Sequence, residues 1–229
     1  MFMNRAHSTF VINLEHRVDR RTDMQRELLG IGWEATFFPA IRPSSAREFT
    51  SAGARGCFLS HLAVLKQAKA LGVERLVILE DDVTFVRDFS RRWQSVLHKL
   101  DTTDWSVFYP GHALNGMSPG LSLLQPEVSV LCAHFMMINN HAISAIAEGL
   151  EAILKRPAGH PLGGPMHVDG AYSTIRAQNP RLQTYALSPV LGYQRPSRTD
   201  IRDTKWFDRP GPLEHLVRVV RRIKARRIN

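Results

Sequence analysis

The sequence is short of the features that mark secreted and membrane-spanning proteins. It contains only two cysteines, Cys57 and Cys132, which are too few for a disulfide framework. No cluster of His and Cys stands at metal-ligand spacing, so we expect buried, reduced thiols and no zinc site. No apolar run approaches the about 18 residues that a bilayer span requires. Residues 1–7 lack the apolar stretch and cleavage site of a signal peptide, and we expect a cytoplasmic protein.

Acidic residues are scarce relative to basic ones. Lys and Arg number 30 against 21 Asp and Glu, which gives a formal net charge of +9. Such an excess indicates an anionic partner, which could be a nucleic acid, an anionic membrane or a phosphorylated substrate. The length of 229 residues suits one α/β domain. We assign residues 1–208 to this domain and residues 209–229 to a basic tail.

The tail combines positive charge with an apolar face. Residues 213–229 include six basic residues and one acidic residue, and the apolar residues Leu216, Val220 and Ile223 recur at helical spacing. This pattern is typical of a basic amphipathic helix on an anionic membrane surface. The tail has no aromatic residue on which a base could stack, so we expect no nucleic-acid partner. We expect a peripheral protein on the inner face of the cytoplasmic membrane.

The most informative stretch is an apolar run that ends in three consecutive carboxylates. Residues 76–79 are uninterrupted by polar side chains, which predicts a strand buried on both faces of a largely parallel sheet. Glu80, Asp81 and Asp82 follow directly, at the strand end where α/β proteins bind ligands. Their mutual repulsion calls for a cation, and oxygen ligands suit Mg²⁺ or Mn²⁺. Strand alternation would place Glu80 and Asp82 on one side and Asp81 on the other.

Two structural alternatives compete with a metal site. The three carboxylates could form a solvated acidic turn, or they could cap a helix that begins near Asp88. Neither alternative requires a bound ion.

The start of the chain predicts a βαβ unit. An apolar run at residues 9–14 precedes a helical pattern at residues 19–30, with Asp19 as its N-cap. Arg17, Arg20 and Arg21 would then lie at the carboxyl edge of the first strand, where we expect contacts to a nucleotide phosphate. A solvated helix face explains any single one of these arginines equally well.

The rest of the chain alternates between helical and extended patterns. We predict helices at residues 56–72, 88–100, 140–154 and 170–178, strands at residues 34–41, 105–109 and 181–187, and loops at residues 42–53, 110–126 and 189–203. Residues 128–138 are strongly apolar around His134. The long loop at residues 110–126 could border an acceptor site.

A second candidate site follows the Gly/Pro-rich turn at residues 163–165. His167 and Asp169 are two residues apart, and therefore on one side of an extended segment, just before the predicted helix at residues 170–178. The alternative is that Asp169 only caps that helix.

Together these motifs resemble glycosyltransferase family 25, which contains bacterial lipooligosaccharide galactosyltransferases and procollagen galactosyltransferases. The resemblance runs from Val11 to about Ile201. Its most specific segments are residues 11–14, Arg17, residues 19–20, 56–61 and 79–83, and its weaker ones are residues 134–135, 168–169, Gln194 and residues 199–201. Two positions depart from the family pattern. Ala54 stands where an acidic residue is frequent, and Thr199 replaces a common serine.

The resemblance implies a GT-A fold and transfer of a sugar, usually galactose from UDP-galactose, with inversion at the anomeric carbon. It makes Glu80 and Asp82 the ligands of Mn²⁺ or Mg²⁺ on the diphosphate of the donor. It assigns the general base to Asp169, with His167 and Asp82 as competitors. The donor-binding residues that it implies are Asn13, Arg17, Arg20, Ser60, His61, Glu80, Asp81 and Gln194. For His61, spacing alone slightly favours a structural role.

We therefore hypothesise a metal-dependent inverting glycosyltransferase that uses a UDP-sugar and extends a lipid-linked saccharide of the bacterial surface. Two other functions are compatible with the same residues. One is a metal-dependent nucleotidyltransferase, and the other is a non-catalytic relative that binds sugar or membrane.

Overall fold

The computed structural model describes residues 7–195. The predicted basic tail at residues 209–229 and the motif at residues 199–201 lie outside this range. No helix within it is both long and apolar enough to cross a bilayer.

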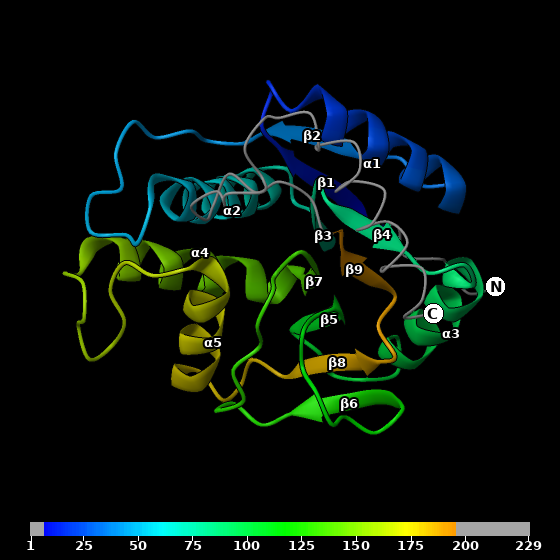
Figure 1. Cartoon of the computed structure of the whole chain (residues 1–229). Coiled ribbons are helices and arrows are strands. Elements are labelled where there is room, and N and C mark those ends of the chain that lie inside the picture. Colours follow the sequence, from blue (N-terminus) through cyan, green and yellow to red (C-terminus); the bar gives the residue numbers. More distant parts are fainter. Residues whose placement is uncertain (1–6, 196–229) are drawn as a thin grey trace.

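A mixed sheet of seven strands forms the centre of the described chain (Figure 1). Its spatial order is β2-β1-β3-β7-β5-β8-β6. Five strands run in one direction, and β6 and β7 oppose them. The strands are β1 Ser8–Asn13, β2 Thr36–Pro39, β3 Arg75–Glu80, β5 Val107–Gly111, β6 Gly120–Leu124, β7 Phe135–Asn139 and β8 Thr184–Ser188. The largely parallel sheet predicted from the sequence is confirmed.

Helices cover both faces of this sheet. They are α1 Val18–Ile31, α2 Ala52–Ala70, α3 Phe89–Leu100, α4 Asn140–Lys155 and α5 Val168–Gln178. Buried side chains of α2, α4 and α5 share one hydrophobic cluster, and those of α1 and α3 share a second. Leu76 and Ile78 of β3 enter the first cluster, whereas Val77 and Leu79 enter the second. The central strand is therefore apolar on both faces, as its uninterrupted run predicts.

Three short strands, β4 Val83–Phe85, β6 and β9 Gly192–Gln194, escaped prediction from the sequence. β6 lies within the predicted loop at residues 110–126 and pairs with β8 at the sheet edge. β9 lies within the predicted loop at residues 189–203 and pairs with β4 in a separate two-stranded sheet. This small sheet matters for the site, because it holds Gln194 beside the acidic residues that follow β3.

Helix α2 begins four residues earlier than predicted, because Ser51 caps it. The Ser51 hydroxyl accepts a hydrogen bond from the amide of Ala54 at 3.0 Å. Gly56 in the first turns lies against the backbone of Ile41, and a Cβ there would come within 2.4 Å of that carbonyl oxygen. The close approach requires glycine and seats the start of α2 against the segment after β2.

Candidate active site

The acidic residues lie at a turn between β3 and β4. β3 ends at Glu80, the chain turns at Asp81 and Asp82, and β4 begins at Val83. The predicted alternation of the three carboxylates is wrong, because the turn ends the strand geometry. One nitrogen of the Arg20 guanidinium lies 2.8 Å from Asp81 Oδ1 and 3.2 Å from Asp82 Oδ2, so these two carboxylates share a side.

Asp81 is held by the protein at both oxygens. Arg20 binds Oδ1, and the side-chain amide of the buried Asn13 donates to Oδ2 at 2.8 Å. Asn13 is the last residue of β1, so the neighbouring strands β1 and β3 together position this carboxylate. Asp81 therefore organises the turn, and Arg20 supplies part of the positive charge that sequence reasoning assigned to a metal.

The negative charge of Asp82 is only partly compensated by neighbouring positive charge. Burial, together with the charge of Glu80, raises its pKa to about 7, although Arg20 opposes the shift. Its Oδ1 atom is buried and has no hydrogen-bond partner within the described chain. A single guanidinium thus leaves the carboxylates short of positive charge, and a divalent cation would fit this deficit.

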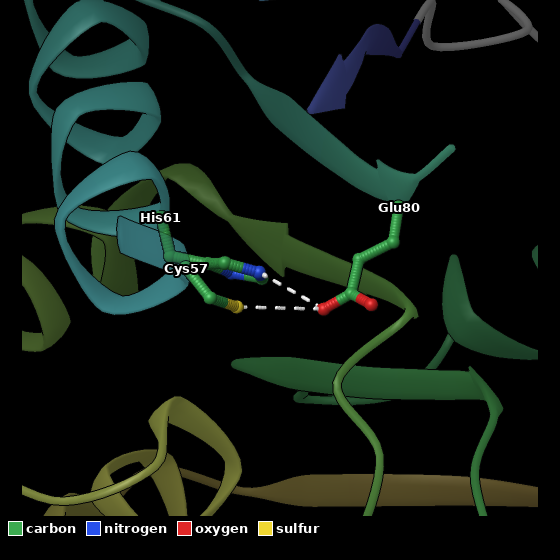
Figure 2. A group of neighbouring side chains, drawn as sticks. All are labelled: Cys57, His61 and Glu80. Atoms are coloured by element: carbon green, nitrogen blue, oxygen red, sulfur yellow. Dashed lines mark hydrogen bonds and ion pairs between the residues drawn. The ribbon is translucent and has the colours of Figure 1, made fainter. Parts of the chain in front are cut away.

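Glu80 faces two different groups with its two oxygens. Oε2 accepts a hydrogen bond from the Gln194 side-chain amide at 3.1 Å. Oε1 lies 3.6 Å from His61 Nε2 and 3.7 Å from Cys57 Sγ, and both of these residues come from α2 (Figure 2). Burial acts to raise the pKa of Glu80, but His61 and the charge of His134 outweigh it and lower that pKa.

The group of Cys57, His61 and Glu80 corrects the expectation that no His/Cys cluster exists. One potential ligand atom from each residue lies within 4.8 Å of the others. The spacing of Cys57 and His61 could have predicted part of this group, because residues four apart lie on the same face of a helix.

The three arginines after β1 differ in their surroundings. Only Arg20 reaches the acidic turn, whereas Arg17 pairs with Asp19 at 3.0 Å and Arg21 lies 4.4 Å over the Phe37 ring. The predicted N-cap is also wrong, because Arg17 occupies that position and Asp19 lies in the first turn of α1.

Arg195 is a basic residue of the site that sequence reasoning missed. Its guanidinium donates to the Asp81 carbonyl at 3.0 Å, and its amide donates to the Asp82 carbonyl at 2.7 Å. The pairing of β9 with β4 brings it there, and only a prediction of that strand pair would have identified it.

Ser60 and His61 are both fully buried in α2. The Ser60 hydroxyl donates to the Gly56 carbonyl at 2.7 Å and accepts from the Ile41 amide at 2.8 Å, so it joins α2 to the segment after β2. His61 Nδ1 lies 3.1 Å from the hydroxyl of Tyr172 in α5. In this conformation Ser60 shapes the site without lining it.

Asp169 lies in the first turn of α5, which begins at Val168, two residues earlier than predicted. Its Oδ2 accepts from the amide of Cys132 at 3.2 Å, and its Oδ1 accepts from the amide of Gly170 at 2.8 Å. Cys132 adopts a left-handed backbone with φ of 68°, which a non-glycine residue rarely does. The contact to Cys132 gives Asp169 a tertiary partner, which simple capping would not require.

The charge of Asp169 acts on the Cys57 thiol, which lies beside Glu80. Burial raises the pKa of the Cys57 thiol well above its usual value, and the charges of Glu80, Asp169 and Asp82 add to this effect. His167, by contrast, is exposed, and its Nε2 lies 3.0 Å from the Thr50 hydroxyl. Of the three candidate bases, Asp169 and Asp82 therefore act electrostatically on Cys57, whereas the exposed His167 is not among the charges that shift its pKa.

The chain is similar to several known glycosyltransferases. Residues 6–116 match the sequence profile of "Glycosyltransferase family 25 (LPS biosynthesis protein)". Procollagen galactosyltransferase 1-B of Xenopus laevis is 26% identical over 220 residues, covering 80% of this chain and 35% of that protein. Procollagen galactosyltransferase 2 of Homo sapiens is 30% identical over 221 residues, covering 80% of this chain and 34% of that protein.

The chain spans about a third of the length of these two relatives. Another match, inactive glycosyltransferase 25 family member 3 of Homo sapiens, is 32% identical over 127 residues, covering 44% of this chain and 21% of that protein. A solved glycosyltransferase involved in the glycosylation of the major capsid of PBCV-1 has the same fold. Its TM-score is 0.53 at 12% identity, over 85% of this chain and 95% of that chain.

The raised pKa of Asp82 predicts a pH-dependent cost to stability. With a pKa of about 7 in the folded chain, against an ordinary value of 3.8, Asp82 binds more protons folded than unfolded between these values. The free energy of unfolding therefore falls as pH rises through this window. We expect Asp82→Asn to be more stable than wild type near pH 8, by about 2–4 kcal/mol, and the difference to shrink toward about pH 4.

Urea unfolding at several pH values measures this difference. Asp104→Asn, which removes an exposed carboxylate, serves as the control and should show no such trend. Equal stability of Asp82→Asn and wild type at alkaline pH would contradict the account.

Proposed function

Because the chain belongs to glycosyltransferase family 25, we propose that it transfers a sugar from a nucleotide-sugar donor to a saccharide acceptor. The observation that carries this proposal is the buried acidic turn at the carboxyl end of β3. In α/β folds this end of a strand is the ligand-binding edge. The turn carries both signs of charge: positive charge from Arg20 and Arg195, and negative charge on Asp82 that is only partly compensated. This combination suits a diphosphate bound together with a cation.

The donor is proposed to be a UDP-sugar, with galactose as the sugar. The names of the two procollagen galactosyltransferases support galactose. Arg20 and Arg195 would hold the anionic diphosphate, and Gln194 is exposed beside Glu80, where it can contact the donor. Asn13 acts indirectly, because its amide fixes Asp81.

A divalent cation is proposed at Asp82 and Glu80, with Mn²⁺ or Mg²⁺ as the ion. The unpartnered Oδ1 of Asp82 and the carboxylate chemistry of both residues fit such an ion. When bound, it would offset the negative charge that develops on the departing UDP.

Asp169 is proposed as the general base of an inverting transfer. Its carboxylate would take the proton of the acceptor hydroxyl as that oxygen attacks the anomeric carbon. The amides of Cys132 and Gly170 hold the carboxylate in place from two sides.

The acceptor is proposed to be a lipid-linked surface saccharide, reached from the inner face of the cytoplasmic membrane. The description of the family profile as an LPS biosynthesis protein supports this acceptor class. The basic residues at 213–229 support attraction to anionic lipid.

The second candidate is that the chain has the fold of the family without its catalytic activity and acts as a sugar- or membrane-binding protein. The match to an inactive family member favours it, and so does the Arg20 guanidinium, which already compensates part of the acidic charge.

Release of UDP from a panel of UDP-sugars separates the two candidates. We expect Mn²⁺-dependent turnover of one sugar, reduced about 100-fold or more in Asp82→Ala because the cation loses a ligand. Asp104→Ala should turn over like wild type. Release of pyrophosphate in place of UDP would indicate a nucleotidyltransferase, and wild type without turnover or UDP binding would favour the non-catalytic relative.

Replacement of the proposed base should affect transfer more than donor binding. Asp169→Asn keeps the side-chain shape but cannot accept the proton, so transfer to an acceptor should fall about 10²–10⁴-fold. UDP affinity, measured by calorimetry, should change little. His167→Gln provides the comparison, and an equal loss of transfer in that variant would move the base assignment to His167.

The membrane proposal predicts salt-sensitive binding to vesicles that contain phosphatidylglycerol. We expect co-sedimentation of the full chain to be lost when the basic residues at 213–229 are changed to glutamine, with transfer to a soluble acceptor retained. Undiminished binding of the neutralised chain would refute the role of the tail.

A further inference from the structure

Three side chains beside the acidic turn form a ligand set of a different chemical kind. Cys57 and His61 lie one turn apart on α2, and both point toward Glu80 at the end of β3 (Figure 2). His61 Nε2 lies 3.6 Å and Cys57 Sγ lies 3.7 Å from the same oxygen, Glu80 Oε1. One potential ligand atom of each residue lies within 4.8 Å of the other two.

The Cys57 thiol donates a hydrogen bond to Glu80 Oε1, but no direct hydrogen bond within the described chain accounts for His61 Nε2. The nitrogen-to-oxygen distance of 3.6 Å exceeds the about 2.7–3.2 Å of a normal N–H···O bond. His61 is fully buried, yet its Nε2 has no hydrogen-bond partner among residues 7–195. A buried nitrogen directed at a carboxylate and a thiol, but bonded to neither at normal distance, points to a ligand between them.

The two distances to Glu80 Oε1 match the edges of a tetrahedral metal site, and the ligand atoms of Cys57 and His61 lie within 4.8 Å of each other. Zinc bonds of about 2.0–2.2 Å to nitrogen and oxygen and about 2.3 Å to sulfur place neighbouring ligands about 3.3–3.7 Å apart. The separations of 3.6 and 3.7 Å agree with such edges. A bound ion would therefore need little movement of the side chains.

We propose that Cys57, His61 and Glu80 bind a thiophilic divalent ion of the Zn²⁺ class. The thiolate excludes Mn²⁺ and Mg²⁺ as preferred occupants, because those ions favour ligand sets of oxygen. Binding would displace the thiol proton to solvent, and water would complete the coordination.

Tyr172 supports His61 as a ligand. Its hydroxyl lies 3.1 Å from His61 Nδ1 and can accept the Nδ1 proton, which leaves the Nε2 lone pair directed toward Glu80 and Cys57. Metal-bound histidines commonly have such a partner on the other ring nitrogen.

This site is separate from the cation site of the proposed function, although both use Glu80. Oε1 faces the α2 residues, whereas Oε2 faces Gln194. Binding here is measured without donor or acceptor, so the inference can fail or succeed independently of the proposed transferase activity.

Titration with Co²⁺ under a non-thiol reductant tests the proposal. We expect one equivalent of Co²⁺ to produce a thiolate-to-cobalt charge-transfer band and the intense visible bands of tetrahedral cobalt. Stoichiometric Zn²⁺ should abolish these bands, and excess Mg²⁺ should not. Cys57→Ser and His61→Gln should lose them, whereas Cys132→Ser should keep them as the matched cysteine control.

A second variant, Tyr172→Phe, tests the site without removing a ligand, so that a loss of the cobalt bands is not simply attributed to misfolding. It leaves all three ligands in place and should weaken Co²⁺ affinity about 10–100-fold without abolishing the bands. Absence of the charge-transfer band in folded wild type, its persistence in Cys57→Ser, or unchanged affinity in Tyr172→Phe would each overturn the proposal.

Discussion

The structure depends on how three consecutive carboxylates are accommodated at the end of a buried strand. Residues 76–79 are completely enclosed, so the charges that follow them stand at the border of a low-dielectric interior. Asn13 and Arg20 hold Asp81, while the chain turn directs Asp82 to the same guanidinium. The elements that supply these contacts are the sheet neighbour β1 and the helix that follows it, so the fold itself builds the site.

Glu80 connects two chemically different surroundings. One of its oxygens faces the amide of Gln194, beside the oxygen-rich turn, and the other faces the nitrogen and sulfur of α2. The two proposed cation sites therefore differ in ligand chemistry on the two sides of one carboxylate. The close approach of Gly56 to Ile41 seats the start of α2 against the segment after β2, and Cys57 and His61 follow on the same helix.

Sequence patterns were sufficient for elements with strong apolar periodicity. The run at residues 76–79 and the helical pattern at residues 88–100 correspond to β3 and α3. The short strands β4, β6 and β9 were missed, because pairing with distant strands and not their own sequence determines them. Arg195 was missed for the same reason. The Cys57 group was missed because its third member, Glu80, is brought to α2 only by tertiary packing.

The central claim is that the acidic turn after β3 binds the diphosphate of a donor together with a divalent cation. A crystal structure of the chain with UDP and Mn²⁺ tests it most directly. The account predicts Mn²⁺ in contact with the carboxylates of Asp82 and Glu80, and the diphosphate within reach of Arg20 or Arg195. A diphosphate bound away from this turn, or Mn²⁺ without contact to either carboxylate, would contradict it.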